Sequence, residues 1–287
     1  MSWLVMKLLL VVLVTHGVRV AGTLVGPRWS GLLLGLPSTT ALVLFCLARR
    51  QGLVFATLAA ESSLLGLAAA VVLALAFALA AGRGWRLPGL LLLAVAGYFL
   101  VAGAFWGAGP LDLPRALLAG AAAITLGCLA TGRRPRGGAP ATSARSALPW
   151  PLALGLRTAI PVGCVLAVTH LAEALGAQGA GLLSTFPSTL LAVLVVTYLE
   201  DGREAAARMA RAFPQGQFST LAYLLLFQLA GPSIGLGGGI CLGYAAALLT
   251  LFAVEGVCRR ALPAPAILTD RGGGIGKRAE LPRLATA

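Results

Sequence analysis

Acidic residues and histidine are scarce in this chain, which has 9 Asp and Glu and 2 His among 287 residues. Only 11% of the residues are charged, whereas about a quarter are charged in typical soluble domains. No HExxH pattern occurs. We expect the acids to be solvated at the ends of apolar runs (Glu61, Glu200, Asp201, Glu204, Glu255). The composition excludes an ordinary soluble domain, and we expect a protein that is not an enzyme.

Cysteine is also sparse, and its spacing excludes two further classes. The 5 cysteines are odd in number, form no CxxC pair and lie in or beside apolar runs (Cys46, Cys128, Cys164, Cys241, Cys258). A disulfide framework uses an even number of cysteines, and a zinc knuckle uses closely spaced pairs such as CxxC. We therefore expect these side chains to act as small apolar packing residues, and we predict no metal site.

Basic residues are frequent, and the formal net charge is +13. They do not form one stripe but flank apolar runs, as Arg49, Arg50, Arg83 and Arg86 do. A nucleic-acid-binding protein gathers its basic residues on one face. Basic residues at the ends of membrane spans instead set the topology and attract anionic lipid. We therefore expect the lipid bilayer, and not nucleic acid, to be the partner of this charge.

A segment of the chain occurs twice. Gly31–Gly52 reads GLLLGLPSTTALVLFCLARRQG, and Gly181–Gly202 reads GLLSTFPSTLLAVLVVTYLEDG. Both begin with Gly-Leu-Leu, carry Pro-Ser-Thr at the same place and end on Gly. Val-Thr-His precedes each copy and ends at His16 and His170, the two histidines of the chain. We interpret the match as an internal duplication of one membrane unit.

Long apolar runs predict an all-α, polytopic transmembrane bundle of about nine spans. We expect a four-span repeat over residues 1–107, a linking span in 108–131 (Ala116–Ala130), a basic linker over 132–149, a second repeat over 150–258 and a disordered tail over 259–287. Trp3–Val20 resembles a secretory signal, but it carries half of the duplicated Val-Thr-His, so we expect a retained helix.

Two segments are too polar or too long to be simple spans. Arg203–Phe213 has the pattern of an interfacial amphipathic helix, and Pro214–Gln217 reads as a polar turn before a span at Thr220–Leu229. By analogy, Leu53–Ser63 is expected at the interface and Leu64–Ala81 in the membrane. Further spans are expected at Leu87–Trp106 and Gly237–Val257.

The distribution of Lys and Arg predicts that the basic linker, the Arg203–Phe213 segment and the tail lie on the cytoplasmic side. If Ala116–Ala130 spans the membrane, the two repeats are inverted and the N-terminus is outside. If it does not, eight spans remain and the copies are parallel. We favour the inverted arrangement, which recurs in secondary transporters with a site at the repeat interface.

Proline inside a span removes a backbone donor and frees a carbonyl one turn earlier. In Pro37-Ser38-Thr39 and Pro187-Ser188-Thr189, hydroxyls follow at once and can satisfy such groups. One interpretation is a pair of broken helices lining a substrate site. The other is a kink at which small residues pack helix against helix. The matching positions in the duplicated segment favour the first interpretation.

An intramembrane histidine is a candidate functional group, because a titratable side chain is expensive to place in lipid. His16 precedes Arg19 by three residues, and His170 precedes Glu173 by three, so each charge shares the histidine's helix face. A proton-coupling role, a structural hydrogen bond and a bis-histidine haem site remain open. In an inverted arrangement the two rings lie at different depths, so we expect no bound cofactor.

The pattern Gly-Leu-Leu, Pro-Ser-Thr and a closing Glu-Asp-Gly, followed by an amphipathic segment and two more spans, resembles the GlpM-like four-span membrane proteins. The resemblance covers residues 155–257 better than 1–107, where Arg49-Arg50-Gln51-Gly52 replaces the acidic turn. It implies a small, transporter-like integral membrane protein and supplies neither a substrate nor catalytic residues.

The sequence thus predicts a multi-pass protein of the cell (inner) membrane that transports a small molecule or ion. The site would lie between the two Pro-Ser-Thr segments, with His16, His170 and Glu173 as lining or coupling groups. The alternative is a non-transporting accessory subunit. In either case a homo-oligomer or a membrane partner is compatible with the sequence.

Overall fold

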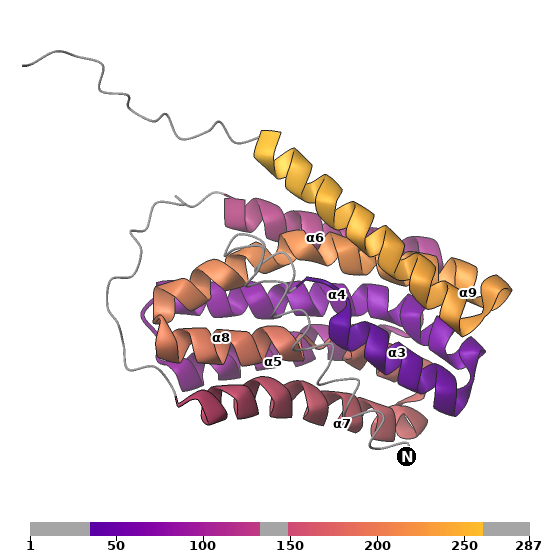
Figure 1. The fold of residues 1–287 in the computed structure, drawn as a ribbon, viewed down its shortest axis with the longest axis horizontal. Helices are drawn as coiled ribbons and strands as arrows, with labels where there is room; N and C mark the ends of the chain where they lie inside the picture. The colour runs from indigo at the N-terminus through magenta and orange to yellow at the C-terminus, as the bar shows by residue number, and fades with distance from the viewer. Residues whose placement is uncertain (1–34, 133–148, 261–287) are drawn as a thin grey trace, which may run out of the picture.

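The computed structural model describes residues 35–132 and 149–260, and this part of the chain is helical with no strand. Its helices are α3 (Ser38–Gln51), α4 (Leu53–Gly82), α5 (Leu87–Ala108), α6 (Leu113–Gly132), α7 (Trp150–Ser184), α8 (Ser188–Glu200) and α9 (Arg203–Arg260). They form one bundle with a common long axis (Figure 1). The predicted all-α class is confirmed for the described residues.

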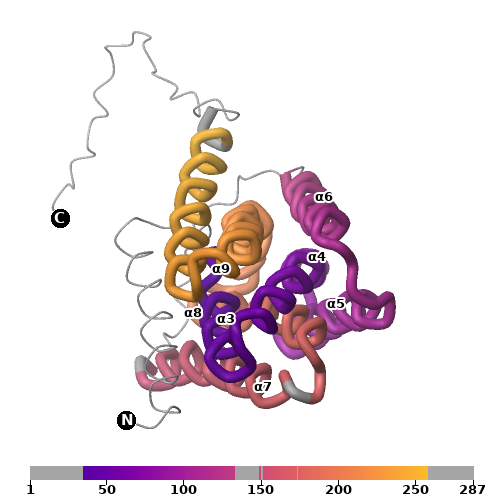
Figure 2. The backbone as a smooth tube through the Cα atoms, turned by 90° about the vertical axis from the view of Figure 1, so that its right-hand side faces the viewer, coloured from indigo at the N-terminus to yellow at the C-terminus, as the bar shows by residue number. Residues whose placement is uncertain are grey.

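Helix α4 is the centre of the bundle and contacts α3, α5, α6, α7 and α9 (Figure 2). Its most apolar stretch is 78% buried, compared with 22% for α5 and α6. The sequence of α4 is apolar on every side, as in a helix that is surrounded by protein. Large side chains such as Leu64, Leu73 and Phe77 fill the core around it.

The outer helices expose apolar side chains outward. Leu100 on α5, Leu118 on α6 and Leu249 on α9 are exposed although each lies in a long apolar helix. Five described helices are long and apolar enough to cross a membrane, or six if the bent pair Ala174–Ser184 and Ser188–Glu200 counts as one span. An apolar core with an apolar exterior is the arrangement of an integral membrane protein.

Helix α6 occupies the place predicted for the linking span at Ala116–Ala130. Trp3–Val20, the first four residues of the Gly31–Gly52 segment, the basic linker and the tail lie outside the described residues, apart from flanking positions of the linker and the tail. The number nine and the two four-helix repeats therefore stay predictions.

The predicted division of Leu53–Ala81 is not seen, because α4 is one unbroken helix of 30 residues. Ala56, Ala59 and Ala60 are fully buried in its first turns. The carbonyl of Ala59 lies against the backbone of Gly181 on α7. This segment is thus a packing surface inside the bundle and not an exposed amphipathic piece.

The predicted polar turn at Pro214–Gln217 is also absent. Helix α9 continues through Pro214 and first leaves helical geometry at Gly235, where φ is 77° and the chain doubles back (Figure 1). Pro214 is buried and lies against Gly127 of α6, and Phe213 is buried against its neighbours. Tertiary packing therefore holds the helix through a sequence that favours a turn in isolation.

Candidate functional site

Helices α3 and α8 begin in the same way. Pro37 and Pro187 precede the first helical residues with φ of −74° and −81°. In each case the next residue, Ser38 or Ser188, donates its backbone N–H to the carbonyl two residues earlier, at 2.7 Å. The fixed φ of proline and its lack of an N–H suit the start of a helix. Each Pro-Ser-Thr segment is therefore a helix N-terminus.

The two N-termini face each other. The hydroxyl oxygens of Thr39 and Thr189 are 3.0 Å apart in a hydrogen bond, and Ser188 donates to Thr39 at 3.5 Å. From this meeting point α3 and α8 run toward opposite ends of the bundle (Figure 1). The chain before α8 is broken at Thr185–Pro187, where the helix axes bend by 46°.

The carbonyls near each break are satisfied by hydroxyls. The carbonyl of Gly35 accepts hydrogen bonds from Thr220 at 2.6 Å and Ser219 at 3.2 Å, both on α9. The carbonyl of Ser184 accepts from Thr40 of the other segment at 3.1 Å. The sequence predicts that hydroxyls just after the prolines satisfy these carbonyls. Thr40 does so, whereas the carbonyl of Gly35 is satisfied by hydroxyls of α9.

A cavity of about 30 Å³ lies between the two helix ends. Residues of both Pro-Ser-Thr segments line it together with Phe213, Gln217 and Thr220 of α9. None of the lining residues carries a charged side chain. The cavity is thus small and largely polar, and it lies within an apolar bundle.

Gln217 is the residue that the sequence did not identify. Its side chain is only 5% exposed, it lines the cavity, and it has no hydrogen-bond partner in the described part of the chain. We had expected Gln217 in a polar turn. The missed signal is helical spacing, since Phe213, Gln217 and Thr220 lie four and three residues apart and share one face of α9.

Of the other predicted site residues that the structure describes, Pro37, Ser188 and His170 do not line this cavity. His170 is exposed on α7. Glu173 belongs to α7, but its side chain lies outside the described set, and so does all of His16. Roles of these residues in lining or coupling stay predictions. Among the described residues, no group of three or more His, Cys, Asp or Glu is placed to hold a metal ion.

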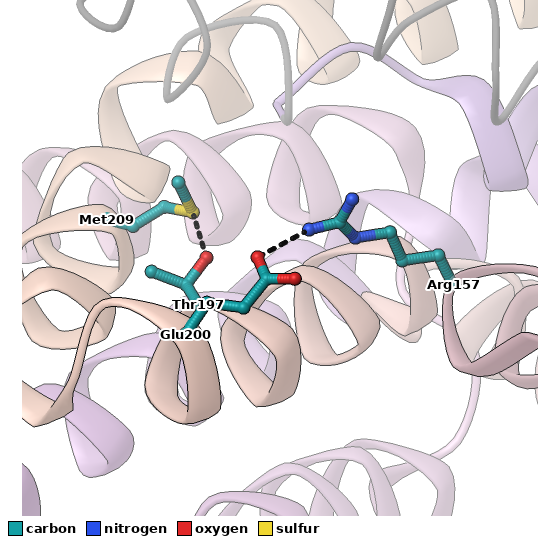
Figure 3. Close-up of polar contacts among 4 residues, drawn as sticks. All are labelled: Arg157, Thr197, Glu200 and Met209. Carbon is teal, nitrogen blue, oxygen red and sulfur yellow. Dashed lines mark hydrogen bonds and ion pairs between the residues drawn. The ribbon is translucent and has the colours of Figure 1, made fainter. Parts of the chain in front are cut away.

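Two of the acids that we expected to be solvated are held inside the protein. Glu200, at the end of α8, accepts a hydrogen bond from Arg157 of α7 at 3.4 Å, and their side chains are 29% and 16% exposed. Figure 3 shows this pair beside the contact between the Thr197 hydroxyl and the Met209 sulfur, at 3.9 Å. Glu255 is 4% exposed. The Arg157–Glu200 pair joins α8 to α7, and the Thr197–Met209 contact joins α8 to α9.

Gly231–Gly235, with the sequence GPSIG, matches the letters of the Gly-x-Ser-x-Gly pattern of serine hydrolases. In those enzymes the serine lies on a sharp turn between a strand and a helix. Here the segment lies within α9 and reaches its break at Gly235, and the described residues contain no strand. The match therefore does not identify a nucleophile.

No family model, no curated protein and no solved structure matches this chain.

Proposed function

We propose that this protein is a secondary transporter of a small solute, which binds in the cavity between Pro37–Thr39 and Pro187–Thr189. The observation that carries the proposal is the meeting of two helix N-termini around a polar cavity inside an apolar bundle. Interrupted helices of this kind form the substrate sites of several transporter folds, where backbone groups freed from the helix are available to a ligand.

The proposal includes two inverted repeats. In its support, α3 and α8 start with the same backbone hydrogen bonds and run in opposite directions (Figure 1). Each ends at a glycine with positive φ, 93° at Gly52 and 90° at Gly202, and a long helix follows at once. Inverted copies related by an axis through the Thr39–Thr189 contact account for all of these features. The membrane we propose is the inner membrane.

The test uses the full-length protein in proteoliposomes. Volume changes are followed by light scattering after mixing with a panel of small anionic, cationic and neutral solutes. We expect at least one solute to enter faster than in empty liposomes. Replacing Pro187, Ser188 and Thr189 together with alanine should abolish that entry.

The control variant is Thr125→Ala, because Thr125 is exposed on α6 and bonds only to Ala121 of its own helix. This variant should transport as the unaltered protein does. Both variants are checked for helical content by circular dichroism. Transport that survives in a folded triple variant, or no entry of any solute through the unaltered protein, contradicts the proposal.

A second candidate is a non-transporting accessory membrane subunit. It is favoured by two close backbone contacts, between Gly181 and Ala59 of α7 and α4 and between Gly35, in the turn before α3, and Gly216 of α9. Close approach at small residues is typical of structural packing in membranes. Under this alternative the triple variant leaves the function of the partner complex unchanged as long as the protein folds.

A further inference from the structure

We propose that the ligand of this cavity is a small monovalent anion of halide size. The inference rests on the proposed function for the location of the site, and it adds the chemical class of the substrate. It starts from the backbone of α3 and α8, which have 14 and 13 residues and are long enough to carry a full helix dipole at their N-termini.

The first step concerns the field at the cavity. A helix N-terminus acts as a positive charge of about half an elementary unit. Two N-termini meet here, and the C-terminus of α7 at Ser184, beside the cavity, offsets about half a unit. The described helix ends thus leave about half a positive unit, and no acidic side chain of a described residue lines the cavity. The field therefore favours an anion over a cation.

The second step concerns the free donors. The backbone N–H groups of the second and third helical residues have no intrahelical acceptor. These are Thr39 and Thr40 on α3 and Thr189 and Leu190 on α8, and neither helix has a side-chain cap. Within the described ranges, no backbone carbonyl accepts from them. Four donors therefore remain available beside the cavity.

The third step is Gln217, which points to a ligand independently of the helix ends. The residue is 5% exposed, carries two N–H donors and forms no hydrogen bond with any described residue. Its amide atoms are not among the fully buried atoms without a partner, which are Tyr223 Oη and Gln228 Oε1 in the described residues, so they reach the space of the cavity. The neighbouring hydroxyl of Thr220 is already committed to the carbonyl of Gly35. The amide is thus the free side-chain donor that α9 brings to this cavity.

The fourth step is size. The cavity volume of about 30 Å³ exceeds the about 10–15 Å³ that one water molecule needs by the same measure. Sugars and phosphate esters are too large to lie within it, and a halide fits. A single water molecule also fits, but it brings no charge to compensate the two helix ends.

The experiment measures thermal unfolding of the purified full-length protein in detergent, with sodium chloride replacing sodium gluconate at constant ionic strength. Gluconate is too large for the cavity. We expect the midpoint of unfolding to rise with chloride along a saturating curve, since a ligand that binds only the folded state stabilises it. Potassium in place of sodium should have no effect.

Gln217→Leu should raise the half-saturating chloride concentration by at least about tenfold, because one donor set is lost. The matched control is Gln215→Leu, which makes the same change on the same helix at a position that does not line the cavity. It should keep the half-saturating concentration of the unaltered protein.

If Gln217→Leu does not fold, Gln217→Asn replaces it, and a weaker but saturable response is expected. A water-filled cavity would give identical curves in chloride and gluconate and would overturn the inference, as would an unchanged response in a folded Gln217→Leu protein.

The outcomes separate this inference from the proposed function. Chloride binding that depends on Gln217, without entry of any solute into proteoliposomes, supports the anion site and contradicts transport. Entry of a neutral solute that the triple alanine variant abolishes, without a chloride response, supports transport and contradicts the anion class.

Discussion

Thr39 and Thr189 place two hydroxyls in contact where the ends of α3 and α8 meet. A buried hydroxyl is stable only when it is hydrogen-bonded, and each of these finds the other, from a position 150 residues away in the chain. Within the described residues, Tyr223 Oη and Gln228 Oε1 are fully buried without a hydrogen-bond partner. Burial alone therefore does not guarantee a partner, and the threonine hydrogen bond is specific to this contact. The pair fixes how the two helix ends meet.

We expect Thr39→Val to lower the free energy of unfolding by about 1–3 kcal/mol, because it leaves the Thr189 hydroxyl unpaired. Thr189→Val should lower it by less, because the Thr39 hydroxyl keeps its contact with Ser188. The double variant should lose less than the sum, since neither hydroxyl remains. Unfolding in mixed detergent micelles measures these values. Thr125→Val, on the exposed face of α6, is the control and should change little. Strict additivity of the two single changes would show that the pair is not coupled.

Among the elements, α4 depends on close backbone contact with α7. A Cβ at Gly181 would collide with the Ala59 carbonyl oxygen, and one at Gly66 would collide with the Thr185 hydroxyl. Small residues at these crossings let the helices approach closely, which is how helices associate in membranes without a hydrophobic driving force between them. The position of α8 follows from this contact, because α8 continues from the end of α7.

Gly181→Ala should therefore destabilise the protein by about 1–3 kcal/mol, through overpacking against α4. Gly163→Ala is the matched control on the same helix, because a Cβ there meets nothing within 4 Å. It should be neutral or stabilising by up to about 1 kcal/mol, since alanine favours a helix more than glycine. Unfolding in mixed micelles distinguishes the two. Equal effects would mean that the crossing has room to relax.

The end of α8 is held by a second interaction between elements, the Arg157–Glu200 pair (Figure 3). Arg157→Ala should lower stability by about 1 kcal/mol, because it leaves a half-buried carboxylate at a helix C-terminus, where negative charge is unfavourable. Arg115→Ala is the control, since its partner Asp112 and Arg115 itself are 57% and 75% exposed. The comparison is again one of unfolding free energies. A larger loss in the exposed pair would contradict this account.

At the scale of the whole molecule, the bundle has two ends with different junctions. The α4–α5 junction and the α8–α9 junction lie at one end, and the α5–α6 junction and the break in α7 lie at the other (Figure 1). Arg83, Arg86 and Arg203 flank the first pair of junctions, and Arg208 and Arg211 follow in the first turns of α9. Among the described residues, the other end has three basic residues, namely Arg49 and Arg50 at the α3–α4 junction and Arg115 at the α5–α6 junction. The excess of Lys and Arg in cytoplasmic loops then predicts that the end with the α4–α5 and α8–α9 junctions faces the cytoplasm.

In a variant whose own cysteines are replaced by serine, new cysteines at Arg83 and Asp201 should react with an impermeant thiol reagent only from the cytoplasmic side. Cysteines at Asp112 and Ala174 should react only from the opposite side. All four positions are exposed, so accessibility is not limiting. Labelling of intact cells and of inverted vesicles makes the comparison. If the two cysteines of either pair react from opposite sides, the prediction that they lie at the same end of the bundle is wrong.

The location of the N-terminus relative to the C-terminus distinguishes inverted from parallel repeats. We expect a reporter fused to the N-terminus to be active only on the outside and one fused to the C-terminus only on the inside. Both reporters on one side would support eight spans and parallel copies. The residues before Gly35 lie outside the described structure, so this measurement addresses a part of the prediction that the fold does not.

Apolar run length and proline placement were sufficient to predict the helical class, the membrane environment, the helix at α6 and the interruption before Ser188. These properties are local, because they depend on the transfer of each run into lipid and on the missing N–H of proline. The continuity of α4 and α9 was not predictable in this way. Pro214 and Gln217 favour a turn by themselves, and only burial against α6 and α8 keeps them helical.

The sequence by itself therefore determined the helical class and the apolar character of the bundle, and that Pro37 and Pro187 have similar surroundings. Only the tertiary structure decided that Thr39 meets Thr189, that Gln217 lines the cavity between them and that His170 does not. The physical reason is that contacts between helices depend on shape and on the pairing of buried polar groups across the bundle, whereas helix formation in a membrane depends on hydrophobicity along the chain.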